Sequence, residues 1–328
     1  MTPLSAFLLA TTLAIPEQQN ANPGYPKATL RSPILTASLY LPDSTNGYYR
    51  GTRFDWSGLV SRVEWGGHTF FCDFKREHDP LNHDDICGTA EEFGIESAPS
   101  YALAKPGEPF IKIGIGILER ADNSDYAFWK RYRVLQPGEW NLGMTRNRIT
   151  FQQSLQAPAG WAYEFVKVVE VSDSAPELKI RRRLKNTGTQ TIDTDHYDHN
   201  FLRIDNVPAG TNYTLDFRFA PHFGKDSKTQ GCVEIRNRSL CFTKAPAPDQ
   251  GIWLRLEGFG ALADNWVKVM DHSTGTAMTI TTDRPLSKLV FYSSGGVLCP
   301  EAFVKVKLAP GETLQWTTTY RFEANTAK

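Results

Sequence analysis

Hydrophobic and polar residues alternate in short segments along most of the chain after Ala28. Alternation with a period of two is typical of strands that bury one face, and Gly, Pro, Asn and Asp turn signals separate the segments. In the first half, strands are expected at residues 34–41, 59–65, 68–71, 110–118, 132–135, 148–155, 163–171, 178–184 and 191–194. In the second half, they are expected at 213–219, 233–235, 252–256, 267–270, 277–281, 289–292, 303–308 and 313–321.

Turn signals indicate how some of these strands are connected. Gly66-Gly67 predicts a tight hairpin. Residues 186–189 (Asn-Thr-Gly-Thr) predict a turn that pairs segment 178–184 with segment 191–194. Residues 110–118 are almost continuously apolar despite two glycines, which favours one buried central strand.

The overall pattern predicts an all-β protein. No segment has the period of an amphipathic helix of three turns, and about sixteen strands with almost no helix indicate a sandwich or a barrel. No Pro/Ser/Gly-rich linker divides the chain. A single large domain of two mostly antiparallel sheets over residues 28–328 is therefore favoured over two smaller domains.

Residues 1–27 are expected to form a leader that precedes the domain. Segment 4–16 is apolar and resembles a weak signal peptide, although no Lys or Arg precedes it, and the following residues are rich in Gln, Asn, Pro and Gly. Two N-glycosylation sequons, at Asn212 and Asn237, and a feasible Cys232–Cys241 disulfide fit a secreted or periplasmic protein. The alternative is a cytoplasmic protein whose five cysteines are all free thiols.

The composition argues against several classes of partner. The 36 basic and 36 acidic residues give a net charge of zero, so neither nucleic acid nor an anionic membrane is expected to bind. No apolar run reaches the roughly 18 residues that a spanning helix needs. The chain has no CxxC pair of the kind that structural zinc sites use, and its 12% of aromatic residues suit stacking on sugar rings.

Two polar segments in the first third of the chain contain candidate binding residues. In segment 47–58, Arg53 offers a fork of donors for carboxylate or hydroxyl groups, beside Asp55 and Trp56. The alternative is a packed loop in which Arg53 and Asp55 pair with each other.

In segment 78–94, His78 and His83 lie among several carboxylates, but their spacing matches no standard metal motif, so a solvated loop is favoured over a metal site. Glu91 and Glu92 would point to opposite sides of an extended chain, so at most one of them, taken as Glu92, would face a cleft.

The segment 195–205 combines two histidines, three aspartates and an arginine at the end of the predicted hairpin. His196 and His199 are three residues apart and cannot share one face of a regular strand. Asp198 and Asp205 are placed to orient an imidazole and to raise its pKa into the working range. This favours His199 as a catalytic acid over a purely structural histidine.

Glu301 is a lone carboxylate among apolar residues, shortly after Gly295-Gly296. Burial would raise the pKa of such a carboxyl group and make it a stronger base near neutral pH. The alternative is an ordinary glutamate on a surface loop.

Two short motifs resemble the aldose 1-epimerase (galactose mutarotase-like) superfamily. Asp198-His199-Asn200-Phe201 is similar to the mid-chain Asn-His-Ser/Asn-Tyr/Phe-Phe motif of that family. Cys299-Pro300-Glu301-Ala302 is similar to its late Glu motif, 301 − 199 = 102 residues further on. The chain departs from the family in two places: Asp198 replaces the usual Asn, and no His-Gly motif is found, with residues 88–94 in its place.

The resemblance, over residues 30–323, implies a galactose mutarotase-like supersandwich and an enzyme that interconverts the anomers of a mono- or oligosaccharide. It implies that His199 protonates the ring oxygen and that Glu301 takes the proton of the anomeric hydroxyl, with no metal and no organic cofactor. The residues expected to bind the substrate are Arg53, Asp55, Trp56, Glu92, Tyr197 and Arg203. Two alternatives stay open: a polysaccharide lyase acting on uronate-containing glycans, with Tyr197 near the cleft, and a non-catalytic carbohydrate-binding protein.

Overall fold

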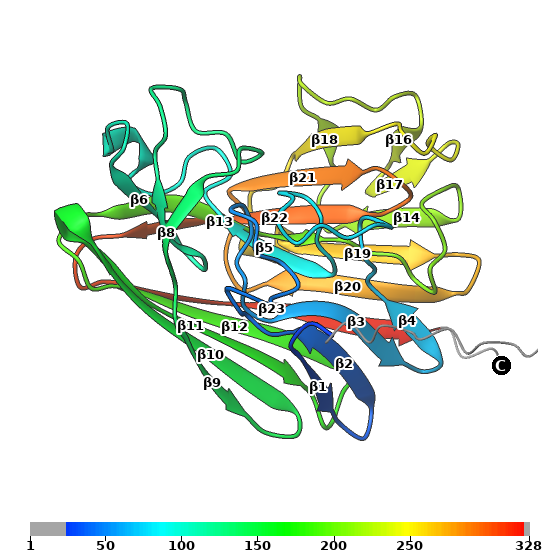
Figure 1. The fold of residues 1–328 in the computed structure, drawn as a ribbon. Helices are drawn as coiled ribbons and strands as arrows, with labels where there is room; N and C mark the ends of the chain where they lie inside the picture. The colour runs from blue at the N-terminus through cyan, green and yellow to red at the C-terminus, as the bar shows by residue number, and fades with distance from the viewer. Residues whose placement is uncertain (1–23, 325–328) are drawn as a thin grey trace, which may run out of the picture.

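The computed structural model describes residues 24–324, which fold almost entirely into antiparallel strands in two large and two small sheets (Figure 1). The ten-stranded sheet consists, in spatial order, of β16 (Val233–Arg236), β17 (Ser239–Phe242), β14 (Tyr213–Phe217), β19 (Trp266–Asp271), β20 (Thr276–Thr282), β23 (Thr313–Ala324), β12 (Glu177–Asn186), β11 (Trp161–Val171), β10 (Arg148–Ala157) and β9 (Trp140–Met144). The six-stranded sheet consists of β15 (His222–Phe223), β18 (Ile252–Glu257), β21 (Lys288–Ser293), β22 (Cys299–Leu308), β13 (Ile192–Asn200) and β5 (Thr89–Phe93).

The small sheets flank these two. One contains β1 (Lys27–Arg31), β2 (Leu35–Tyr40), β3 (Leu59–Trp65) and β4 (His68–Phe70), and the other β6 (Pro109–Lys112), β7 (Gly116–Glu119) and β8 (Arg133–Pro137). The helices within residues 24–324 are three short 3₁₀ turns, η1 (Tyr101–Leu103), η2 (Pro158–Gly160) and η3 (Leu262–Asp264). None of them is long and apolar enough to cross a membrane.

The two large sheets pack face to face. Tyr320 of β23 donates a hydrogen bond of 3.0 Å to the side chain of Asn200 of β13, so the strands of one sheet contact those of the other. The main hydrophobic core takes buried residues from both sheets, such as Met278 and Leu254. Full burial of such side chains contributes about 1.5–3 kcal/mol each. The predicted all-β sandwich is confirmed.

The alternating pattern explains why these segments are strands. In β10, Ile149, Phe151 and Leu155 are buried toward the core while the residues next to them are at least partly exposed. The predicted hairpin at Gly66-Gly67 is confirmed as the turn between β3 and β4, where both glycines have positive φ angles, 59° and 83°. Side-chain alternation therefore predicts most of the strands, with ends that shift by a few residues.

The prediction of one buried strand at 110–118 is wrong, because this segment forms the hairpin β6–β7. The chain turns at Gly114, whose φ of 83° favours glycine. A Cβ atom at this position would lie 2.6 Å from the carboxyl carbon of Asp55, so the turn packs against that side chain. The apolar residues on both sides of the turn are buried, which hides the turn in the hydrophobicity pattern.

The predicted hairpin between segments 178–184 and 191–194 is also wrong. β12 lies in the ten-stranded sheet between β11 and β23, whereas β13 lies in the six-stranded sheet between β22 and β5. The chain therefore crosses from one large sheet to the other between β12 and β13. Asn186 stabilises this connection, since its side-chain amide donates hydrogen bonds to the carbonyl oxygens of Gln190 and Leu308 at 2.7 and 2.9 Å. β13 also continues to Asn200, so residues 195–200 of the charged segment are part of the strand, and only residues 201–205 follow it.

Five strands were not expected from the pattern: β1, β5, β9, β15 and β17. The important one for the site is β5, which contains Glu91 and Glu92 and is buried along its whole length. Adjacent glutamates are typical of solvated loops. Here each of them has a buried cationic partner.

The suggested Cys232–Cys241 disulfide is wrong, because all five cysteines are free thiols. Cys241 lies opposite Glu234 in the β16–β17 pair, and the residue across from Cys232 is Thr243, whose amide donates to the Cys232 carbonyl oxygen at 2.8 Å. The Cys232 thiol lies 3.4 Å from the side-chain oxygen of Gln250.

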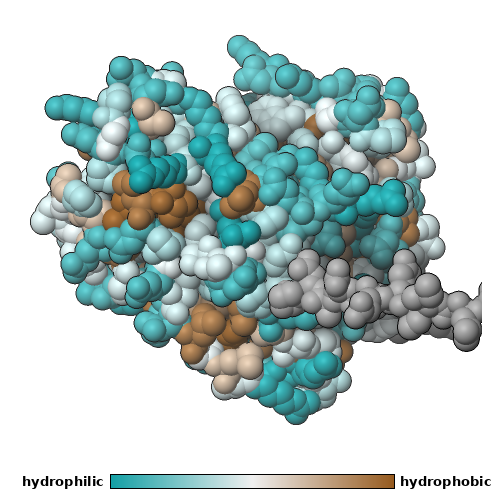
Figure 2. All heavy atoms as spheres, viewed as in Figure 1, coloured by the Kyte–Doolittle hydropathy of each residue, from teal (hydrophilic) through white to brown (hydrophobic). Residues whose placement is uncertain are grey.

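Most of the expected leader, residues 1–27, lies outside the described residues, which begin at 24. β1 already begins at Lys27, and the ring of Tyr25 packs edge-on against Tyr48 with a centroid distance of 5.3 Å. The folded part therefore begins slightly before the predicted boundary. Figure 2 shows that the face seen in Figure 1 is largely hydrophilic, with a few hydrophobic patches.

Candidate functional site

β13 presents chemically different residues on its two faces. His196, Asp198 and Asn200 point into the sandwich, where they contact residues of the ten-stranded sheet. Tyr197 and His199 point to the opposite face. The prediction that His196 and His199 lie on different faces is confirmed.

His199 and Glu301 meet on this outer face. Nε2 of His199 lies 3.1 Å from Oε1 of Glu301, although the two residues come from different strands, β13 and β22. The imidazole stacks on the ring of Phe201 at a centroid distance of 4.3 Å, and the edge of Phe54 closes another side at 5.7 Å. These aromatic contacts fix the plane of the imidazole. We call the two residues the His199–Glu301 pair.

A cavity of about 290 Å³ opens above the pair, and we call it the inner cavity. This volume is close to the lower limit of small-molecule sites and suits a ligand of sugar size. The lining residues come from the β2–β3, β4–β5 and β7–β8 connections, from the ends of β5 and β13, and from β18, β21 and β22. They are Arg53, Phe74, His83, Asp84, Ile95, Phe128, His199, Phe201, Trp253, Tyr292 and Glu301.

Burial changes the acid–base properties of the pair. It raises the pKa of Glu301 to about 8, because the enclosed carboxylate loses its hydration. It lowers the pKa of His199 well below its usual range, and the positive charge of Arg53 lowers it further. At neutral pH the two groups therefore share one proton, which resides on the carboxyl group in the resting site.

The aspartates expected to orient His199 bind other residues. Asp198 points into the sandwich and accepts a hydrogen bond from Thr318 at 2.9 Å. Asp205 pairs with His68, with 2.7 Å between Oδ2 and Nδ1. Within residues 24–324, Nδ1 of His199 has no hydrogen-bond partner. The expected rise in the pKa of this histidine is therefore wrong: neither aspartate contacts the imidazole, and burial lowers its pKa.

Arg53 forms one wall of the inner cavity and is fixed by buried groups behind it. Its guanidinium donates to Oε2 of Glu92 at 2.9 Å and to the hydroxyl of Tyr197 at 3.0 Å. The rings of Phe54 and Phe128 each lie 4.3 Å from its central carbon. Arg53 thus lines the cavity, whereas Glu92 and Tyr197 are fully buried and position it.

Lys112 completes the arrangement behind Arg53. Its ammonium group, also fully buried, donates to Glu92 at 3.1 Å and to the hydroxyl of Tyr126 at 2.8 Å. Two cations therefore face one anion, which leaves excess positive charge near the His199–Glu301 pair. Of these groups, Arg53 lowers the pKa of Glu301 and partly offsets the effect of burial, whereas Glu92 raises it.

Of the six expected substrate-binding residues, only Arg53 lines the inner cavity. Besides Glu92 and Tyr197, which lie behind Arg53, the remaining three bind other parts of the protein. Asp55 is buried against Ser57 and Lys167, at 2.7 and 3.4 Å. The indole N–H of Trp56 donates to the Gly51 carbonyl at 2.8 Å. Arg203 donates to the carbonyl oxygens of Gly295 and Gly296, which secures the turn before β22.

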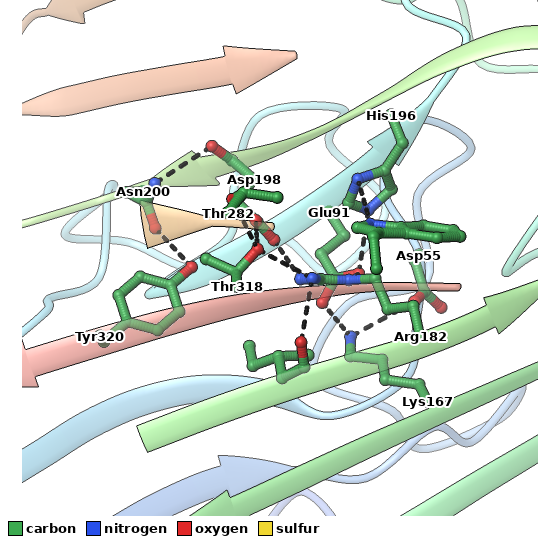
Figure 3. Close-up of polar contacts among 12 residues, drawn as sticks. Asp55, Glu91, Lys167, Arg182, His196, Asp198, Asn200, Thr282, Thr318 and Tyr320 are labelled. Carbon is green, nitrogen blue, oxygen red and sulfur yellow. Dashed lines mark hydrogen bonds and ion pairs between the residues drawn. The ribbon is translucent and has the colours of Figure 1, made fainter. Parts of the chain in front are cut away.

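A cluster of buried charges lies between the two large sheets (Figure 3). Arg182 of β12 contacts Glu91 at 2.6 Å and Asp198 at 2.5 Å, and Lys167 of β11 contacts Glu91 at 2.7 Å. His196 lies 3.1 Å from the same glutamate. We call these five residues the inter-sheet cluster. Each carboxylate in it has a cationic partner from the opposite sheet.

Glu91, His196 and Asp198 also have the spacing of metal ligands, with one potential ligand atom of each lying within 4.8 Å of the others. Nδ1 of His196, however, accepts a hydrogen bond of 3.3 Å from the indole of Trp316. The proton is then on Nε2, which donates to Glu91 and has no free lone pair for a cation. Arg182 and Lys167 already supply the positive charge, so the arrangement favours an ion-pair cluster over a metal site.

Several lining residues were missed by sequence reasoning. His83 and Asp84 lie in the segment that was interpreted as a solvated loop, and Phe128, Trp253 and Tyr292 were attributed to no site. Trp253 could have been found from the alternation in β18. Its neighbours Ile252 and Leu254 are on the buried face, so the pattern places this large aromatic side chain on the other face, where it is 37% exposed.

Solved structures with the same fold span almost the entire chain. The Slr1438 protein from Synechocystis sp. PCC 6803 aligns with a TM-score of 0.58 and 13% identity over 98% of this chain and 100% of that one. A galactose mutarotase-like protein from Clostridium acetobutylicum aligns with a TM-score of 0.53 and 12% identity over 91% and 95%. An aldose epimerase homologue from C. elegans aligns with a TM-score of 0.52 and 12% identity over 92% and 99%.

Sequence comparison adds nothing to this, since no protein-family model matches the chain. No curated protein sequence matches it either. The structural alignments alone support the resemblance seen in the two short motifs. The chain therefore has the fold of the galactose mutarotase-like proteins, with a sequence that has diverged far from those of the solved structures.

Proposed function

We propose that this protein interconverts the α and β anomers of a sugar, with His199 as the acid and Glu301 as the base. The observation that carries the proposal is the 3.1 Å contact between Nε2 of His199 and Oε1 of Glu301 at the wall of the inner cavity. A proton donor and a proton acceptor side by side in a site of sugar size match what opening a cyclic hemiacetal requires. The shared fold with galactose mutarotase-like proteins supports the same class of chemistry.

The reaction needs no net transfer of protons or electrons. Glu301 removes the proton of the anomeric hydroxyl while His199 protonates the ring oxygen, so the bond between C1 and the ring oxygen breaks and an aldehyde forms. Rotation about C1–C2 exposes the other face of the aldehyde, and closure reverses both proton transfers. Because the resting proton is on Glu301, it first crosses the short contact to His199.

The surroundings of the pair suit a neutral sugar. Trp253 and Tyr292 offer aromatic faces, and His83 and Asp84 offer polar groups for hydroxyls. Arg53 is already bound to Glu92, which leaves it less able to clamp a substrate carboxylate. Tyr197, the residue that would serve a lyase, has its hydroxyl bound to Glu92 at 2.6 Å and is fully buried. These contacts favour anomerisation over β-elimination.

Saturation-transfer NMR on a panel of reducing sugars tests the proposal. The protein is expected to speed exchange between the two anomeric signals of at least one sugar above the spontaneous rate. Incubation with uronate-containing polymers, followed by ultraviolet absorbance, tests the lyase alternative. The proposal is overturned if no sugar exchanges faster, and an unsaturated product would then identify a lyase.

The pH dependence of anomerisation is a second prediction. The active pair needs one shared proton, and it loses this proton as the pH rises through the pKa of Glu301, about 8. Above that pH, kcat/KM is expected to fall by about tenfold per unit. Rates measured between about pH 6 and 10, with the spontaneous base-catalysed rate subtracted, check this expectation. A rate that increases through this range would show that the proton-free pair is the active form.

A further inference from the structure

A second hollow adjoins the inner cavity, and we call it the outer groove. Its volume is about 390 Å³. Ile95, Phe128, Trp253 and Glu301 line both spaces. A ligand whose anomeric carbon lies at the His199–Glu301 pair therefore has the outer groove directly beside it.

The outer groove is rich in exposed aromatic surface. Two tryptophans within residues 24–324 are exposed to solvent, and both line this groove. The exposed fraction is 60% for Trp129 and 37% for Trp253. Phe128 packs against Trp129 in a T-shaped arrangement, with ring centroids 4.9 Å apart and planes at 86°. Indole rings left in water at a concave site are typical of binding surfaces.

The polar groups of the outer groove balance each other in charge. Nζ of Lys288 lies 2.8 Å from Oε1 of Glu96 and 4.1 Å from the ring centroid of Phe303. The pair offers a donor and an acceptor to hydroxyl groups but no net charge. A ligand with apolar ring faces, a hydroxylated edge and no charge fits this combination.

We propose that the outer groove binds a second, neutral sugar ring, so that the substrate is an oligosaccharide with its reducing end at the His199–Glu301 pair. The inference depends on the proposed anomerisation in one respect: it is the proposed function that assigns the reducing-end ring to the inner cavity. Trp129 stacks on the second ring, and the Lys288–Glu96 pair binds its hydroxyls. A monosaccharide would fill the inner cavity and leave the groove empty.

Matched pairs of sugars test this inference: D-glucose against maltose and cellobiose, and D-galactose against β-1,4-galactobiose. The measured quantity is the ratio of kcat/KM for anomerisation of the disaccharide to that of the monosaccharide, together with the corresponding ratio of dissociation constants from calorimetry. For at least one pair the ratio is expected to favour the disaccharide. Trp129→Ala is expected to reduce that preference by about fivefold, the size of one aromatic contact.

Two control variants separate stacking from general damage. Trp129→Phe keeps an aromatic face and is expected to retain most of the preference. Leu262→Ala removes an exposed apolar side chain that is 54% exposed and lies outside both spaces, and it is expected to leave the ratio unchanged.

Each result bears on one of the two proposals. Equal ratios in the wild type and in Trp129→Ala for every pair, in both kinetics and binding, would overturn the outer-groove inference while anomerisation stands. If no sugar is anomerised but a disaccharide binds more tightly through Trp129, the proposed function fails and the outer groove is still a sugar site.

Discussion

Replacing Glu301 by glutamine is expected to slow anomerisation of the accepted sugar by about 10²–10⁴-fold. The amide keeps the shape of the side chain but cannot take the proton of the anomeric hydroxyl. His199→Ala is expected to have a similar effect, because the ring oxygen loses its proton donor. Since the two groups exchange one proton across 3.1 Å, the double variant is expected to be little worse than either single variant.

The surface of the protein offers a matched control for this experiment. His222 and Glu257 form a histidine–glutamate pair at the surface, with 3.5 Å between Nε2 and Oε2 and side chains that are 64% and 42% exposed. Glu257→Gln and His222→Ala are expected to leave the exchange rate in saturation-transfer NMR unchanged. Wild-type rates in both Glu301→Gln and His199→Ala would refute the assignment of the pair.

Replacing Arg182 by methionine is expected to reduce the free energy of unfolding by about 3–5 kcal/mol. The guanidinium is completely buried and contacts Glu91, Asp198 and the hydroxyl of Thr318. Methionine fills much of the space but leaves the charge of Asp198 without a cation between the two sheets. An unpaired buried charge costs far more than the lost attraction of an exposed pair.

Arg181 provides the control for this variant because it is the neighbouring residue on the same strand and points outward. Its guanidinium contacts Glu170 at 2.5 Å, and its side chain is 45% exposed. Arg181→Met is expected to cost about 1 kcal/mol or less. Urea unfolding followed by tryptophan fluorescence measures both losses. Equal losses in the two variants would show that the inter-sheet cluster does not stabilise the sandwich.

The architecture is largely readable from the sequence because strand periodicity is local. The predicted β3–β4 hairpin needs only Gly66-Gly67 and the flanking alternation. The choice of sheet is not local. Residues 186–189 predict a turn correctly, but whether β13 pairs with β12 or with β22 depends on partners more than a hundred residues away. For that reason the crossing between the two sheets could not be predicted.

The candidate site was predictable in part. His199 and Glu301 were selected for the chemistry of their side chains, and the structure brings them together. Asp55 and Trp56 were selected as a hydroxyl-binding group and an aromatic platform in the same loop as Arg53, but neither residue type nor closeness in the sequence decides which side of a loop a side chain faces. A lone aromatic residue such as Phe128 has no chemical signature that separates a cavity wall from a core.

The use of both faces of β13 restricts how this strand can change. Side chains alternate strictly along a strand. Inserting or deleting a single residue between Asp195 and His199 would therefore move side chains of β13 from one face of the sheet to the other. The imidazole of His199 would then point into the charged interior between the two large sheets, and a carboxylate would point into the inner cavity. Evolution along this stretch is therefore expected to proceed by replacement of side chains at constant length.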